Sequence, residues 1–369
     1  MVSTAGGTTS ARLHELDSMR AVAALGVICW HYIHAFDAAP LGNLLAPFYG
    51  RGLLMVDFFF VLSGFVLTNA FWTDHRAPHF AANVRARVAR MYPLHAAMLV
   101  TVATLQWYLV MGLNAAPFIY TYNDPFHFVL NALLLNGSGL QEGFSFNAPA
   151  WSISTEFLVN LVFLGLISLP RRFARIGLLL VGSAALGTMA VRGVINGTRA
   201  FGVVDNDLVR TAAGFVVGVA TAVARSRWSW RLPAWACDLA ALALLAACMI
   251  YLATRTLWSN AGDMLVCFVG FPALVLSVIG SGAVRSVLRL RPLVYLGEIS
   301  YSIYLVHFPV QLLIHVISVR TGVVPPFGSR WFFVAFIAVV IAVAAVTYRL
   351  IELPGKRVLM PGRVAPEPA

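Results

Sequence analysis

The chain has 369 residues, of which 60% are hydrophobic and 11% charged, and its formal net charge at pH 7 is +11. A water-soluble protein of this length needs a much more polar surface, so the composition indicates a membrane protein with many spans. Loop arginines that set topology explain the positive charge, and we expect no nucleic-acid partner. The four cysteines lie in or beside apolar segments without paired spacing, so we expect neither a disulfide framework nor a metal site.

Ten apolar stretches are long enough to cross a bilayer as helices. They are residues 18–36, 51–71, 92–112, 151–169, 174–191, 208–224, 236–253, 262–280, 295–318 and 331–351. A shorter apolar piece, residues 126–135, predicts a re-entrant or interfacial segment. The predicted fold class is an all-α polytopic membrane protein with about ten transmembrane helices. It divides into an N-terminal segment 1–17, a membrane domain 18–354 and a short tail 355–369.

The Lys and Arg residues predict how these spans are oriented. If the N-terminus is cytoplasmic, the outside segments hold only Arg51, Arg192, Arg199, Arg210, Arg255, Arg320 and Arg330. The other 19 of the 26 Lys and Arg residues then lie on inside segments, which is a strong positive-inside signal. Both termini are therefore expected in the cytoplasm, the connection 113–150 is expected outside, and the predicted location is the cell inner (cytoplasmic) membrane.

The first span carries ionisable residues that are costly inside a membrane. Arg20 and His31 are eleven positions apart, about three helical turns, so they share one helix face about 16 Å apart. Histidine can accept and return a proton near neutral pH. The alternatives are that Arg20 anchors the span at the inner surface and that His31 is a packing residue. His34 lies a turn further along.

The second span contains Asp57, and a buried carboxylate needs a partner. By topology His31 is the nearest candidate, and an aspartate that orients a histidine raises its basicity. The alternative is that Asp57 pairs with an arginine or serves packing alone. The adjacent Ser63-Gly64 step favours helix packing over a nucleophile.

Arg87 and Arg90 are three residues apart, which places both guanidinium groups on one helix face in the first inside loop. Two guanidinium groups at a membrane surface suit a phosphorylated ligand. The alternative is a topological charge cluster that contacts lipid phosphates.

The fourth span begins with Trp151 and Ser152 and contains Glu156. Tryptophan is an ordinary membrane-interface anchor, and its face can also bind a sugar ring. Glu156 is not explained by anchoring and is a functional candidate.

The ninth span carries a polar stripe at helical spacing, formed by Ser300, Tyr304, His307 and Gln311. Such a stripe is a candidate for function, although it can also hold helices together. Pro309 should kink this helix just beyond His307.

In this order, the stretches resemble the acyltransferase 3 family of integral membrane acyltransferases. The resemblance lies in Arg20 and His31, in the run from Val56 to Gly64, in Arg87-x-x-Arg90-x-x-Pro93, in Trp151-Ser152 leading to Glu156, in Gly297-x-x-Ser300-Tyr301-x-x-Tyr304-Leu305-x-His307, and in Glu352-x-Pro354. The run Ile153-Ser154-Thr155 departs mildly from the usual hydrophobic pattern. The fused esterase-like domain of larger relatives is not expected here.

The resemblance implies transfer of an acyl group, commonly acetyl, from cytoplasmic acyl-CoA to a hydroxyl of an envelope glycan, a lipid-linked sugar or a small secondary metabolite. Acyl-CoA is then the donor substrate, with no permanently bound cofactor. The competing function class is a proton-coupled transporter or flippase. It is disfavoured because no inverted repeat and no matching pair of broken spans is evident.

The same resemblance assigns provisional roles to the candidate residues. His31 is the expected catalytic base, oriented by Asp57 or Glu156, or alternatively the carrier of an acyl-histidine intermediate. Arg20, Arg87 and Arg90 are expected to bind the nucleotide end of acyl-CoA. Ser300, Tyr301, Tyr304 and His307 are expected to line its path, and Trp151, Ser152 and His34 to contact the acceptor.

Overall fold

The computed structural model describes residues 12–72, 79–196, 199–200, 204–227 and 232–360. The predicted terminal segments 1–17 and 355–369 are therefore described only in part. Among the arginines used for the topology prediction, Arg76, Arg231 and Arg363 lie outside the described residues.

Ten helical stretches of the described chain are long and apolar enough to cross a membrane, which confirms the predicted fold class. Their main helices are α1 (His14–Phe36), α2 (Ala46–Arg51), α3 (Met55–Phe71), α4 (Phe80–Trp107), α6 (Trp151–Ile167), α7 (Arg171–Arg192), α8 (Asn206–Arg227), α9 (Ala234–Ala253), α10 (Asn260–Leu265), α11 (Phe271–Gly280), α14 (Ser300–Thr321), α15 (Arg330–Thr347) and α16 (Leu353–Leu359). Shorter elements are α5 (Pro125–Ala132), α12 (Ala283–Leu288), α13 (Arg291–Glu298) and the antiparallel strands β1 (Arg199–Ala200) and β2 (Val204–Asp205).

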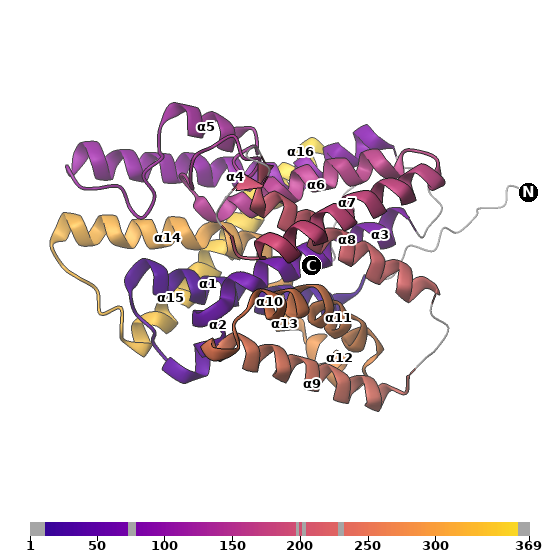
Figure 1. Ribbon diagram of the computed structural model, residues 1–369. Helices are drawn as coiled ribbons and strands as arrows, with labels where there is room; N and C mark the ends of the chain where they lie inside the picture. Colours follow the sequence, from indigo (N-terminus) through magenta and orange to yellow (C-terminus); the bar gives the residue numbers. More distant parts are fainter. Residues whose placement is uncertain (1–11, 73–78, 197–198, 201–203, 228–231, 361–369) are drawn as a thin grey trace, which may run out of the picture.

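Helix α1 is the central element of the bundle, packed against α2, α3, α13 and α14 (Figure 1). It begins at His14, earlier than the predicted residue 18. The earlier start places Glu15 inside the protein, where it forms ion pairs with Arg285 at 3.1 Å and Arg289 at 2.9 Å. These ion pairs compensate the carboxylate and tie α1 to the α12 region.

The predicted ninth span, 295–318, divides at Ile299 into the separate helices α13 and α14. A side chain at Gly297 would overlap the backbone of Asp17, so the glycine lets α13 lie directly against α1. Pro309 lies inside α14 and does not end it. Ser300 and His307 consequently stand on one helix, while Glu298 belongs to its neighbour.

Helices α3 and α8 approach closely because glycines face backbone on both sides. A side chain at Gly64 would overlap the backbone of Phe215, and one at Gly218 would overlap that of Val61. Small residues at such a crossing are typical of membrane helix pairs. The packing role predicted for the Ser63-Gly64 step is therefore confirmed for Gly64.

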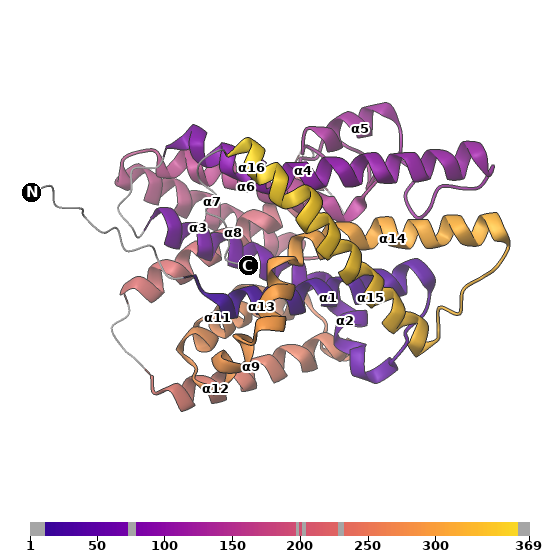
Figure 2. The same cartoon turned by 180° about the vertical axis from the view of Figure 1, so that it is seen from behind.

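The connection between α4 and α6 folds back onto the helices instead of extending away from them. Its short helix α5, seen at the top of Figure 2, is capped by Asp124, which accepts a hydrogen bond from the backbone N–H of His127 at 3.0 Å. That hydrogen bond lowers the pKa of Asp124. Further along, the side chain of Asn147 donates to the carbonyl of Leu305 at 3.0 Å. The loop is thereby fixed against α14.

Candidate functional site

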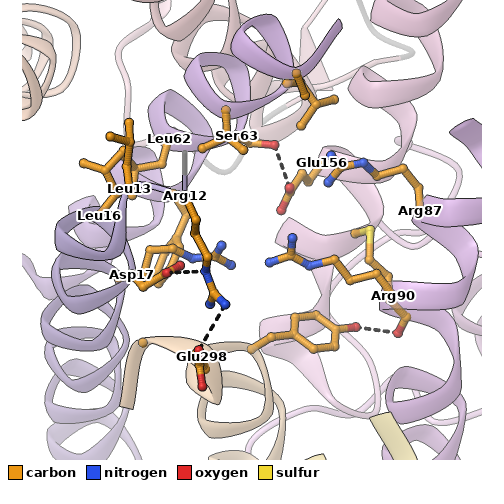
Figure 3. A pocket seen from close by; sticks show the side chains of 18 of the residues that line it. Arg12, Leu13, Leu16, Asp17, Leu62, Ser63, Arg87, Arg90, Glu156 and Glu298 are labelled. Atoms are coloured by element: carbon orange, nitrogen blue, oxygen red, sulfur yellow. Dashed lines mark hydrogen bonds and ion pairs between the residues drawn. The ribbon is translucent and has the colours of Figure 1, made fainter. Parts of the chain in front are cut away.

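A cavity of about 660 Å³ opens among α1, α3, α4, α6, α13, α14 and α16, at the end of the bundle where α1 begins (Figure 3). We call it the arginine cavity. Its charged lining residues are Arg12, Asp17, Arg20, Arg87, Arg90, Glu156, Glu298, Glu352, Lys356 and Arg357. The volume lies within the range of about 300–1,000 Å³ that is usual for small-molecule sites.

Three of the four carboxylates that line the arginine cavity are already neutralised. Arg12 bridges Asp17 at 2.9 Å and Glu298 at 3.0 Å, as the dashed lines in Figure 3 show. Lys356 pairs with Glu352 at 2.7 Å. These ion pairs occupy Asp17, Glu298 and Glu352. The three carboxylates therefore do not pair with the other arginines of the cavity.

Arg20, Arg87 and Arg90 have no carboxylate within ion-pair distance among the residues that the structure describes. The remaining acid of the cavity, Glu156, accepts a hydrogen bond from Ser63 at 2.7 Å. Three sheltered guanidinium groups that are not ion-paired strongly favour an anionic occupant. Guanidinium groups match phosphate oxygens in geometry and charge, so the cavity is suited to a phosphorylated ligand. The structure brings these three predicted residues together.

A second, smaller cavity of about 40 Å³ adjoins the first and shares Arg20, Phe59, Glu156 and Tyr301 with it. We call it the inner cavity. Its other lining residues are Val56, Phe60, Ser152, Ile153, Ser300 and Tyr304. The hydroxyl of Tyr304 donates to the carbonyl of Pro149 at 2.9 Å and lies 2.8 Å from Ser152 Oγ. The predicted residues Ser152, Ser300, Tyr301 and Tyr304 therefore do meet at one place.

His31 and His307 face each other beyond Tyr304, with ring centroids 4.8 Å apart. The ring of His307 lies 5.8 Å from that of Tyr304. Nδ1 of His31 lies 3.0 Å from the Val27 carbonyl, and Nδ1 of His307 lies 2.5 Å from the Tyr304 carbonyl. Because a carbonyl only accepts, each Nδ1 carries the hydrogen, and each Nε2 keeps its lone pair. Nε2 of His31 is thus the atom able to take a proton.

The expected pairing of Asp57 with His31 is wrong, and the alternative pairing with an arginine is correct. Arg210 on α8 donates from Nε to Asp57 Oδ1 at 2.8 Å and from Nη2 to Oδ2 at 2.5 Å. Asp57 is 0% exposed and Arg210 1% exposed. A bidentate, desolvated pair of this kind satisfies both charges locally.

Sequence reasoning missed Arg210 as a functional residue because it was counted as an outside loop charge. The signal was nevertheless present, since Arg210 falls within the predicted span 208–224, where a cation requires a partner. Its guanidinium also lies over the ring of Trp151, 5.8 Å from the centroid. Arg210 thereby links Asp57 to the start of α6.

Glu156 lies with the arginines and not, as expected, beside His31. It lines both cavities, and its Oε1 accepts the hydrogen bond from Ser63. Figure 3 shows its carboxylate between Ser63 and Arg87. Helix α6 begins at Trp151, so Glu156 lies just over one turn into this helix. Its side chain lines the arginine cavity.

The two aromatic residues predicted to contact the acceptor, Trp151 and His34, lie in different environments. Trp151 is 6% exposed and packs near the rings of Phe60 and Phe144, so it lies inside the bundle and not at the interface. His34 is exposed and stacks on Trp30 with ring centroids 3.9 Å apart. Only His34 is therefore open to an external ligand.

The fold and site define a multi-pass helical membrane protein that contains a cationic cavity and, separately, a buried histidine pair. Comparison with known proteins gives this class a family. The acyltransferase 3 model, described as an acyltransferase domain, matches residues 13–349, and the chain belongs to that family. The predicted resemblance is thereby confirmed, and the protein is an acyltransferase by family.

The names of similar proteins agree with this assignment. The chain is 28% identical to acyltransferase MdmB of Streptomyces mycarofaciens, over 97% of this chain and 96% of the relative. It is 22% identical to O-acetyltransferase OatA of Staphylococcus aureus, over 93% of this chain but only 57% of the relative's length. Protein 2 in the picA locus of Rhizobium radiobacter is 33% identical over 40% of this chain. No solved structure matches the chain.

Proposed function

We propose that this protein transfers an acyl group, acetyl in the first instance, from cytoplasmic acyl-CoA to a hydroxyl of an envelope glycan, a lipid-linked sugar or a small secondary metabolite. The observation that carries the proposal is the cluster of Arg20, Arg87 and Arg90, which have no ion-pair partner among the described residues and line a cavity of about 660 Å³. The printed name of OatA, an O-acetyltransferase, supports an oxygen acceptor and an acetyl group.

The proposed orientation places the arginine cavity on the cytoplasmic side of the inner membrane. It is supported by the excess of Lys and Arg on the loops at that end of the spans. Coenzyme A carries phosphates that cannot enter hydrocarbon, so its nucleotide end must bind at a surface-facing cationic cavity. Arg87 and Arg90 hold the phosphates in this proposal, and the thioester end extends toward Tyr304.

The proposed chemistry begins with the acceptor hydroxyl beside Nε2 of His31. His31 takes the hydroxyl proton as the acceptor oxygen attacks the thioester carbonyl carbon. The new C–O ester bond forms, the C–S bond breaks, and the CoA thiolate leaves. The proton held by His31 then neutralises that thiolate, so the products are the ester and free CoA. The imidazole of His307 faces that of His31, which becomes positively charged in this step.

The experiment that tests this proposal uses membranes from cells that carry or lack the gene, incubated with CoA labelled in its acetyl group. We expect CoA release and label on an extractable acceptor only where the gene is present. Transport of an unmodified molecule across the membrane, without CoA release, would contradict the proposal and favour the transporter alternative.

A further inference from the structure

One polar side chain of the stripe on α14 has no role in the proposed chemistry. Gln311 is 0% exposed, and neither Oε1 nor Nε2 of its carboxamide has a hydrogen-bond partner among the described residues. A buried amide without partners is costly, because it loses its hydrogen bonds to water and gains none within the protein. The partner of Gln311 is therefore a water molecule or a ligand.

Gln106 shows how the same side chain is satisfied elsewhere in the bundle. It is 2% exposed, its Nε2 donates to the carbonyl of Phe118 at 3.1 Å, and its Oε1 accepts from the N–H of Phe118 at 3.1 Å. The amide of Gln106 thus holds the loop after α4 against that helix. Gln311 is equally buried and makes no such contact within the described chain, so a structural hydrogen bond does not account for it.

Gln311 stands one turn beyond His307 on the same face of α14, because residues four apart on a helix are neighbours. Nε2 of His307 is also buried and has no hydrogen-bond partner in the described part of the chain. Since Nδ1 of His307 faces a carbonyl of its own helix, this free Nε2 lies on the opposite side of the ring. Three unpaired polar atoms therefore lie within one turn of α14, beside the ring that faces His31.

The facing turn of α1 offers the amide no polar partner. Helices α1 and α14 lie side by side (Figures 1 and 2). They run in the same direction, since Arg20 and Ser300 near their starts line one cavity and His31 faces His307 further along. The residue one turn beyond His31 is Ala35, which is partly exposed and packs against an apolar cluster shared with α14. An alanine side chain cannot form a hydrogen bond and fills little space.

The free atoms suit an acceptor molecule that carries a second polar group beside the hydroxyl to be acylated. In the proposed chemistry that hydroxyl donates its proton to Nε2 of His31. A glutamine amide both donates and accepts, so it can pair with a neighbouring hydroxyl in either direction. Neighbouring hydroxyls are a general feature of sugar rings, whereas a simple alcohol would leave the amide of Gln311 unpaired.

We infer that Gln311 is an acceptor-binding residue, whose carboxamide forms hydrogen bonds with a polar group next to the hydroxyl that attacks the thioester. This inference rests on the proposed function, because it assumes that His31 receives the acceptor hydroxyl. The acceptor that it indicates is a compound with neighbouring polar groups, as in a sugar residue.

The test measures acetyl transfer by the purified full-length protein in detergent, from acetyl-labelled CoA to a whole-cell extract of a strain that lacks the gene. The rate is followed at increasing extract concentration and, separately, at increasing acetyl-CoA concentration. Gln311→Met keeps the length of the side chain and removes both polar atoms. We expect the extract concentration for half-maximal transfer to rise about tenfold and that of acetyl-CoA to stay unchanged.

Gln106→Met is the matched control, because it removes the same amide from an equally buried position. It should leave both half-saturating concentrations unchanged and lower the melting temperature, since the N–H and C=O of Phe118 lose their partner. Gln311→Met should not lower the melting temperature, because the amide of Gln311 forms no hydrogen bond within the described chain.

Each result has a defined meaning. An unchanged half-saturating extract concentration in Gln311→Met overturns the inference alone, and is the result expected if only water occupies the site. A Gln311→Met protein that melts as low as Gln106→Met, or does not fold, shows a structural role and also overturns the inference. Absence of acetyl transfer by the unsubstituted protein would instead overturn the proposed function, and the inference with it.

Discussion

At the scale of residues, the Asp57–Arg210 pair and the arginine cluster show two outcomes for a buried charge. Asp57 and Arg210 satisfy each other within one bidentate contact. Arg20, Arg87 and Arg90 face a cavity, and the described part of the chain offers them no such partner. Because desolvated charges need compensation, the first arrangement is suited to stabilising the fold and the second to binding an anion.

Removal of one member of the Asp57–Arg210 pair should destabilise the protein by about 3–5 kcal/mol, because the other charge stays buried without its bidentate partner. Arg210 would still have the longer ion pair with Asp207 at 3.5 Å. Asp57→Ala and Arg210→Ala should therefore each lower the melting temperature in detergent. The double variant Asp57→Leu with Arg210→Leu should recover part of the loss. If both single variants melt like the original protein, the pair has no structural role.

Arg87→Ala should weaken CoA binding about tenfold, since a charge-assisted phosphate contact contributes about 1.5–3 kcal/mol. Arg85→Ala is the control, because Arg85 is exposed on the same helix and does not line the cavity. Isothermal titration with CoA measures both. Equal loss in the two variants would identify a general charge effect instead of a binding site.

The sequence allowed the arginine cluster to be predicted, but not the partner of Asp57. Arg20, Arg87 and Arg90 could be assigned to one region because helical spacing and the positive-inside rule place them at the same membrane surface. The partner of Asp57 could not be assigned correctly, since His31 and Arg210 are both compatible with its depth. Only the close packing of α3 on α8 selects Arg210.

At the scale of elements, the contact between α3 and α8 positions both Asp57 and the phenylalanines of the inner cavity. Glycine on each helix allows the two backbones to approach. The ten spans were predictable because a bilayer imposes a minimum apolar length. The break at Ile299 was not, because it depends on the fit of Gly297 against α1, which no apolar pattern encodes.

Gly218→Ala should destabilise the protein by about 1–3 kcal/mol, because the added methyl group would overlap the backbone of Val61. Gly187→Ala is the matched control, since nothing lies within 4 Å of the position that its Cβ would take. Thermal melts followed by size-exclusion chromatography compare the two variants. Equal stability of Gly218→Ala and Gly187→Ala would show that the crossing tolerates a side chain.

At the scale of the whole molecule, the proposal requires donor and acceptor to enter from opposite sides of the bundle. The arginine cavity opens at the end where α1 begins, and the loop that carries α5 packs at the other end of α4 (Figures 1 and 2). Arg20 lines that cavity, and His31 lies eleven residues further along α1, about 16 Å toward the other end. The eleven-residue spacing thereby separates donor binding from chemistry.

A reporter fused to the C-terminus should be located in the cytoplasm, because the positive-inside signal predicts that both termini lie there. Paired alkaline-phosphatase and fluorescent-protein fusions measure this directly. Phosphatase activity without fluorescence would invert the orientation and place the arginine cavity outside, where cytoplasmic acyl-CoA has no access.

The central claim is that His31 is the catalytic base of an acyl transfer whose donor binds on the arginines. The most direct measurement compares acetyl transfer and CoA binding in His31→Ala, using membranes that contain the acceptor, with His79→Ala as an exposed control outside both cavities. We expect His31→Ala to bind CoA normally and to lose transfer by about 10²–10⁴-fold. Near-normal acetyl transfer by His31→Ala would contradict the account.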